Sequence, residues 1–244
     1  QKAGKMTFYW GWNHSSYSNS DIHFKGADHD FTLYDVQAKD RQTPFGTIYF
    51  SSDLWIPQYN TRLSYYLDDR HAISFGLDHM KYFVRNSQTV NIEGSISTTR
   101  SSEHAGTYDG TTSKQIETGF VEFEHSDGLN YYSLELETFD PFWISRDKKH
   151  MVSTYWGLGA GVVIPKSNVK LLGGERHDEF DVTGYGLGFK GGVETLVYED
   201  FFMRLAGKIG YIRMVDVLTS PNAIDKAEHD FRFYEGYVVF GYQF

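Results

Sequence analysis

The sequence contains no cysteine, only five prolines, and no apolar run long enough for a membrane-spanning helix. The lack of cysteine excludes disulfides, thiolate-bound zinc and a cysteine nucleophile. The lack of an apolar run of about 18 residues excludes transmembrane helices, but membrane β-barrels need only about 9–11 alternating residues per strand. Basic residues are scarce as well, since 23 Lys and Arg stand against 32 Asp and Glu, for a net charge of −9. Such a chain lacks the basic face that binds phosphates, so we expect no nucleic-acid partner.

Aromatic residues are abundant, at 17% of the 244 residues, although the mean hydropathy is only −0.46. Disordered chains are poor in aromatics, so this composition indicates a folded protein, and the length allows one large domain. The combination of many aromatics with a hydrophilic average needs an explanation from their positions in the sequence.

The last fourteen residues, FRFYEGYVVFGYQF, alternate between apolar and smaller or polar side chains, which is the period of a β-strand. One face carries Val238, Phe240, Tyr242 and Phe244. A terminal strand with alternating aromatics and a final Phe resembles the closing strand of bacterial outer-membrane β-barrels. The resemblance implies a single signal-cleaved domain, spanning 1–244, in the outer membrane of a Gram-negative cell, similar to barrels of the outer-membrane protein A and W types. The alternative is an edge strand of a soluble sandwich.

The rest of the chain contains seven further segments with the same alternation: 6–14, 59–67, 72–83, 129–139, 151–164, 184–198 and 201–214. Together they predict an all-β, antiparallel barrel of eight strands. The resemblance implies that its short connections (68–71, 140–150 and 199–200) are periplasmic and its long loops (15–57, 85–117, 165–180 and 215–230) extracellular.

The strand count has one alternative. Residues 115–125 also alternate, so the fourth strand is either unusually long or breaks at Asp127-Gly128 into a hairpin. A break, with 31–38 as another membrane strand, would give ten strands. That version puts the long segment 85–114 on the periplasmic side, against the pattern of the family that the chain resembles, so eight strands are preferred.

The alternation directs nine charged side chains into the barrel: Arg62, Asp78, Glu135, Glu137, Lys190, Glu194, Arg204, Lys208 and Glu235. Four positive and five negative charges in a narrow lumen are expected to pair, because an unpaired buried charge is costly. A salt-bridged plug is therefore preferred over a narrow channel for small solutes or a proton-linked pair at Glu135 and Glu137.

The outward aromatics are expected to sit where the barrel meets the lipid headgroups. This predicted belt consists of Trp10, Trp12, Trp143, Tyr198, Phe201, Phe240, Tyr242 and Phe244.

Two loop segments are weighed as chemical sites. Asp28, His29 and Asp30 could ligate a divalent cation, but their spacing matches no known motif and solvated acids are the preferred explanation. The segment containing Glu124, His125 and Ser126 is similar to the His-x-Ser segment of the lipid A deacylase PagL. In that family His and Ser are two residues apart on one strand face, whereas His125 and Ser126 are adjacent, which puts an acyl-ester hydrolase in doubt.

The sequence therefore predicts a non-enzymatic outer-membrane barrel whose extracellular loops bind a partner protein, an envelope component or a ligand. Lipopolysaccharide and a membrane-protein complex are the expected partners. No cofactor is expected beyond a divalent cation at the acidic loops.

Overall fold

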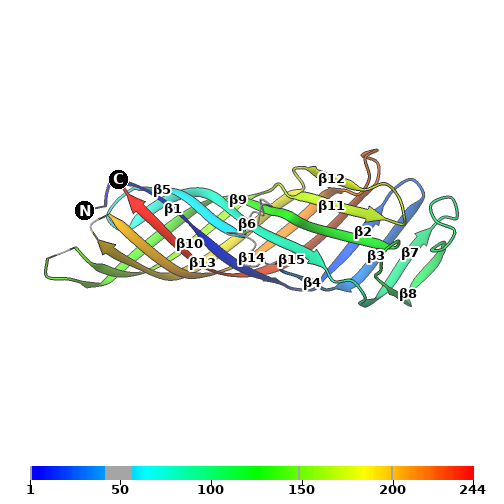
Figure 1. Ribbon diagram of the computed structural model, residues 1–244, viewed down its shortest axis with the longest axis horizontal. Helices are drawn as coiled ribbons and strands as arrows, with labels where there is room; N and C mark the ends of the chain where they lie inside the picture. Colours follow the sequence, from blue (N-terminus) through cyan, green and yellow to red (C-terminus); the bar gives the residue numbers. More distant parts are fainter. Residues whose placement is uncertain (1, 42–56, 148, 199) are drawn as a thin grey trace, which may run out of the picture.

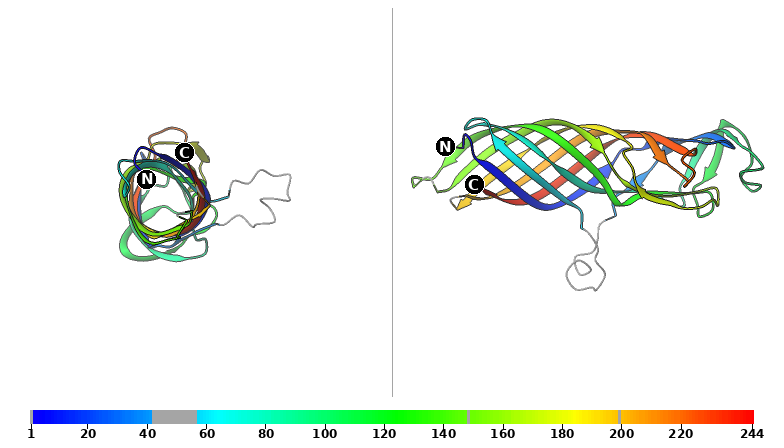
Figure 2. Two further views of the ribbon diagram at one scale, coloured as in Figure 1. Left: turned by 90° about the vertical axis from the view of Figure 1, so that its left-hand side faces the viewer. Right: turned by 90° about the horizontal axis from the view of Figure 1, so that it is seen from above.

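The computed structural model describes residues 2–41, 57–147, 149–198 and 200–244. Eight of its strands form a closed antiparallel ring (Figures 1 and 2). In order around the ring they are β1 (Met6–Tyr17), β5 (Tyr59–Tyr66), β6 (His71–Val84), β9 (Val121–Ile144), β10 (Met151–Val163), β13 (Gly184–Tyr198), β14 (Phe201–Leu218) and β15 (Lys226–Gln243). The ring closes because β1 pairs with β15 from Thr7 opposite Gln243 to Tyr17 opposite Phe233. The predicted fold class and the strand number are confirmed.

The structure also decides between the alternatives for the fourth strand. β9 runs without a break through Asp127-Gly128 for 24 residues, so the long-strand version is confirmed, although the strand begins at Val121 and residues 116–120 do not belong to it. Residues 31–38 fall mainly in β3 (His29–Val36), which pairs with β2 (Ser20–Lys25) and β7 (Thr89–Ile96) and not with the ring. The ten-strand alternative is therefore wrong.

The predicted long loops contain further strands, all at the end of the barrel opposite the two chain termini (Figure 1). Besides β2, β3 and β7 these are β4 (Ala38–Lys39), β8 (Gly106–Gln115), β11 (Lys166–Leu171) and β12 (His177–Phe180). β2 pairs with the first residues of β15, and β11 pairs with the first residues of β9. Both strands therefore extend the wall of the barrel at this end. We call this end the distal half. Of the predicted loop 15–57, residues 42–56 lie outside the described residues.

The half nearer the termini, the belt half, exposes apolar side chains around its outer wall. Exposed leucines and isoleucines fill the middle, and aromatic residues form a ring at each edge. The lower ring is Phe8, Tyr65, Phe142, Trp143, Tyr198, Phe201, Tyr242 and Phe244. The upper ring is Trp12, Tyr59, Tyr132, Tyr185, Tyr211 and Tyr234.

The height of this belt fits a bilayer. On β14, ten residues separate Phe201 from Tyr211. At about 3.3 Å per residue and a strand tilt of about 40°, they span about 25 Å, the height of the apolar band of membrane β-barrels. An exposed apolar surface of this extent is not stable in water, so the belt half spans a membrane. In the described part of the chain there is no helix long and apolar enough to cross a bilayer.

The predicted belt residues divide between these levels. Trp12 lies in the upper ring, whereas Trp143, Tyr198, Phe201, Tyr242 and Phe244 lie in the lower ring. Trp10 and Phe240 face each other across β1 and β15, between the two rings.

The interior of the barrel changes along its axis. In the belt half the lumen holds charged and aromatic side chains. In the distal half a large apolar cluster fills the space between the strands, with Phe24, Leu33, Ile92, Phe123 and Phe231 among its fully buried members. The distal half is therefore packed like a water-soluble β-protein, with its apolar side chains inside.

Candidate functional site

The nine predicted lumen charges are all buried in the belt half, with at most 4% of each residue exposed. Eight of them are joined by ion pairs. Glu135 lies at the centre and contacts Arg62 at 3.1 Å, Lys190 at 2.6 Å and Lys208 at 2.6 Å. Arg62 and Lys208 both reach Asp78, at 2.7 and 2.6 Å. This arrangement compensates the eight paired charges that the lumen withdraws from water.

The network continues toward the chain termini. Lys190 also binds Glu137, which approaches Arg204 at 3.7 Å, and Arg204 binds Glu194 at 2.8 Å. Lys2, which precedes the first strand, completes the chain by binding Glu194 at 2.7 Å. The sequence prediction missed Lys2, because no alternation marks a residue outside a strand. With Lys2 the lumen holds five positive and five negative groups.

The fifth carboxylate, Glu235, is held differently. It accepts a hydrogen bond from the side-chain amide of Asn60, which in turn accepts one from Asn13. At the upper end of the network, a neutral amide therefore takes the place that a Lys or Arg partner has for the other carboxylates.

Aromatic rings close the lumen around Arg204. Its guanidinium carbon lies 4.7–5.0 Å from the ring centres of Phe202, Phe139, Tyr9 and Tyr155. Inward glycines make room for the long charged side chains: a Cβ on Gly188 would lie 2.7 Å from Cε of Lys208. Side chains fill a lumen of this size, as expected for eight strands.

Above the charged lumen, two histidines are enclosed in the distal core. Nδ1 of His125 lies 3.0 Å from Oγ of Ser167, and Nδ1 of His229 lies 3.1 Å from Oγ of Ser20. Burial, with a smaller contribution from His229, holds the pKa of His125 well below its usual 6.5, and burial lowers the pKa of His229 to about 3. Both imidazoles are therefore neutral at physiological pH and behave as core residues.

This geometry bears on the residues compared with the deacylase. His125 is fully buried and is bonded to Ser167, not Ser126, and its Nε2 has no hydrogen-bond partner. Glu124 lies on the opposite face, where it accepts a hydrogen bond from Asn168 at 2.7 Å. The structure does not bring Glu124, His125 and Ser126 together into a triad.

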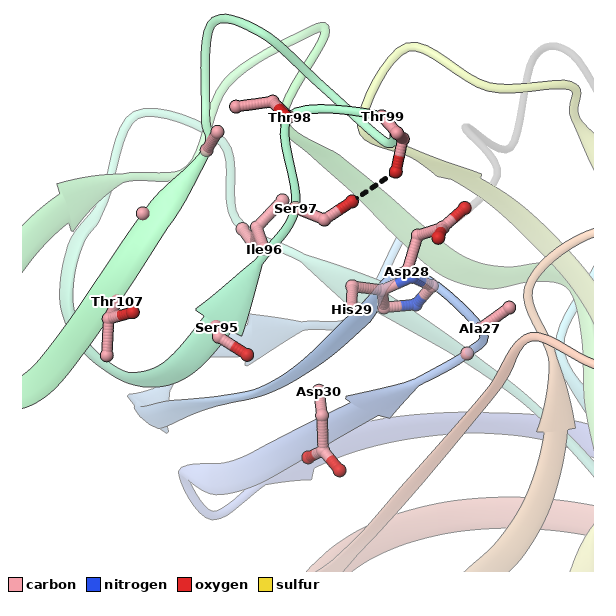
Figure 3. A pocket seen from close by; sticks show the side chains of 13 residues that line it. Ala27, Asp28, His29, Asp30, Ser95, Ile96, Ser97, Thr98, Thr99 and Thr107 are labelled. Atoms are coloured by element: carbon pink, nitrogen blue, oxygen red, sulfur yellow. Dashed lines mark hydrogen bonds between the residues drawn. The ribbon is translucent and has the colours of Figure 1, made fainter.

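The distal rim contains a pocket of about 660 Å³ between the β2–β3 turn and the β7–β8 connection (Figure 3). Asp28, His29 and Asp30 all line it. Successive side chains of an extended segment point to opposite sides, so the three do not converge on one point. His29 is buried, whereas Asp28 and Asp30 are exposed, and Asp30 is 2.8 Å from Nε2 of His23. Within the described ranges no group of three or more His, Asp or Glu side chains is arranged to hold a metal ion.

A second pocket, of about 570 Å³, adjoins the first and shares Ala27, Asp28 and Thr99 with it. Its other walls come from the connections that follow β11 and β14, the latter with Asp225. Arg100 is contributed by the β7–β8 connection. Four distal connections therefore meet at one place on the rim. Sequence analysis did not find this site, since its hydroxyl-rich residues carry no motif.

No protein-family model matches the chain, and no curated protein matches it in sequence. Solved structures do align with it along its whole length. OprG from Pseudomonas aeruginosa is 11% identical with a TM-score of 0.48, covering 100% of this chain and 97% of its own. Neisserial surface protein A is 13% identical with a TM-score of 0.40, covering 99% and 98%. AlkL is 9% identical with a TM-score of 0.42, covering 100% and 91%.

The chain has the architecture of a small outer-membrane β-barrel. Its own closed ring and apolar belt establish this architecture. The distant likenesses concern the architecture and not a ligand.

Proposed function

We propose that the protein is a closed outer-membrane barrel that holds a rigid binding module outside the cell. The belt half is the anchor, and the distal half binds a partner protein, an envelope component or a ligand. Both termini lie at the belt end, which is the periplasmic end of barrels of this type, so the distal half faces outward (Figure 1).

One observation carries the proposal: the barrel axis is blocked at two successive levels. The ion-pair network from Asp78 to Lys2 fills the belt lumen, and the apolar cluster fills the distal half. A solute would have to break buried ion pairs and then cross an apolar core, so conduction is disfavoured. Among the described residues, the recesses on the rim offer places where the distal half can meet another molecule.

Two measurements test the proposal. Purified protein in planar bilayers is expected to show no steady conductance. In native outer membranes, replacing residues 89–115 by a short turn is expected to abolish co-purification or cross-linking of the bound molecule while the barrel still inserts. Stable single-channel currents, or association unchanged by the trimmed hairpin, would overturn it.

A further inference from the structure

The two rim pockets form one groove. They share a wall made by Ala27, Asp28 and Thr99, and each has a volume within the range of small-molecule sites. We call them the hydroxyl lobe and the charged lobe, and together the rim groove.

The hydroxyl lobe is lined mainly by groups that both donate and accept hydrogen bonds. They are the hydroxyls of Ser95, Ser97, Thr98, Thr99 and Thr107. Asp28 and Asp30 add acceptors, and among the described residues no Lys or Arg lines this lobe. A carboxylate or phosphate ligand would face Asp28 without a compensating cation, so an anion is disfavoured. Figure 3 shows the paired hydroxyls of Ser97 and Thr99 on the same side of the lobe as Asp28.

His29 supplies an independent sign of a ligand. Only 4% of it is exposed, and neither ring nitrogen has a hydrogen-bond partner. A buried polar group without a partner is costly and is seldom left so in a folded protein. Burial lowers the pKa of His29, so the ring is neutral and offers one donor and one acceptor. A ligand hydroxyl, which can accept from one nitrogen or donate to the other, suits this ring.

The charged lobe adds complementary groups. Arg100 has a buried Nε without a hydrogen-bond partner, while its Nη2 donates to the carbonyl of Leu171 at 2.8 Å. Asp225 is largely buried close to His29: a Cβ on Gly26 would lie 2.2 Å from Oδ1 of Asp225 and 2.4 Å from Cε1 of His29. Only glycine at position 26 lets these two side chains pack this closely against the backbone of the β2–β3 turn. This lobe therefore offers strong donors and strong acceptors side by side.

We propose that the rim groove binds a neutral oligosaccharide, with one sugar unit or more in each lobe. Sugar hydroxyls would donate to Asp28 and Asp225, accept from Arg100, and exchange hydrogen bonds with the Ser and Thr hydroxyls and with His29. A metal ion is a poorer occupant, since Asp30 is already bound to His23 and no three ligands converge in the described residues. The inference rests on the proposed function, because it names the ligand class of the outward-facing module.

The test uses the full chain in detergent or lipid nanodiscs. The probes are an array of defined neutral oligosaccharides, uronic acid-containing and sulfated saccharides, an oligolysine peptide, and calcium chloride. We expect neutral oligosaccharides to bind. Asp28→Asn and Thr99→Val, which alter the shared wall, should weaken that binding, Asp28→Asn by about tenfold because it removes charge-assisted hydrogen bonds. The matched control is Glu179→Gln, an exposed distal carboxylate outside both lobes, which should leave binding unchanged.

Binding of anionic saccharides, oligolysine or calcium alone would overturn the oligosaccharide assignment while leaving the proposed function in place. Neutral binding that is unaffected by both wall variants would overturn the location. If no probe binds and the trimmed 89–115 hairpin does not alter native association, the oligosaccharide and the proposed function both fail.

Discussion

The belt half and the distal half are built from the same strands but are inverted relative to each other. β15 shows both arrangements within 18 residues. In its distal part, Phe231 and Phe233 point inward and Glu228 and Asp230 outward; in its belt part, Glu235 points inward and Phe240 outward. The period of two is unchanged, and only the polarity of the faces is exchanged. The surroundings of each half, lipid or water, therefore decide which face of the strand carries the apolar residues.

The largest expected effect comes from the belt lumen. Glu135→Leu leaves Arg62, Lys190 and Lys208 without their shared carboxylate, and we expect it to lower the free energy of unfolding by about 3–5 kcal/mol. Urea unfolding in lipid vesicles, followed by tryptophan fluorescence, measures the loss. The exposed control Glu179→Gln should change stability by less than about 0.5 kcal/mol. A loss under about 1 kcal/mol for Glu135→Leu would indicate a hydrated lumen instead of a plug.

The distal core should respond separately. Phe231 is fully buried and stacks on Tyr82 with ring centres 4.7 Å apart. Phe231→Ala is expected to destabilise the distal half by about 3–5 kcal/mol, since it opens a cavity in an apolar core. Hydrogen exchange should accelerate in β2, β3 and β7 and remain slow in the belt strands. The adjacent outward variant Arg232→Ala serves as the control. Equal acceleration in both halves would show that the barrel unfolds as one unit.

A single charge placed on the outer wall distinguishes the lipid-facing half from the water-facing half. Leu205→Arg, near the middle of the belt, is expected to cost about 2–4 kcal/mol because the guanidinium enters the bilayer. Thr112→Arg, on the exposed strand β8, should cost less than about 0.5 kcal/mol because its surroundings are water. Folding titrations of both variants in vesicles provide the test. Similar costs at the two positions would contradict the assignment of the belt to lipid.

Acidification should produce the smallest effect, and only in the distal half. Burial lowers the pKa of His125 and His229, so below about pH 6.5 these histidines bind protons in the unfolded chain but remain neutral in the folded chain. Stability is therefore full above about pH 6.5 and falls as the pH drops toward about 3. Between pH 6.5 and 5.5 each histidine should cost about 1 kcal/mol. Hydrogen exchange of β2 and β3 at the two pH values measures this loss.

His229→Gln, which keeps a polar side chain beside Ser20, should reduce the loss between pH 6.5 and 5.5 by about 1 kcal/mol, the share of one buried histidine. If this variant keeps the full dependence, the proton uptake belongs to other groups.

The ring strands could be predicted from sequence because each carries its own alternation. The inward charges followed directly, since a side chain two residues from a lumen residue also faces the lumen. An unusually long β9 was open to prediction as well, because the alternation continues before residue 129, although the strand begins at Val121 and not at 115. Local pattern was sufficient wherever one face meets lipid.

The distal strands and the rim could not be predicted in the same way. β8 is exposed along nearly its whole length and rich in Ser, Thr and Gly, and it is a strand because it pairs with β7. The bond from His125 to Ser167 joins residues 42 positions apart, and Lys2 reaches Glu194 across 192 positions. Such contacts depend on the closed ring, and no local periodicity encodes them.

The unbroken course of β9 determines how far the distal half reaches from the membrane. From Tyr132 in the upper aromatic ring to Val121 at its distal end, the strand continues for eleven residues. At about 3.3 Å per residue and a tilt of about 40°, these residues lift the rim about 28 Å above the lipid headgroups. Because the lift is provided by paired strands and not by a tether, the rim is held at a fixed height and orientation. A force applied to the rim would be transmitted along the backbone hydrogen bonds of this strand directly to the membrane-spanning half.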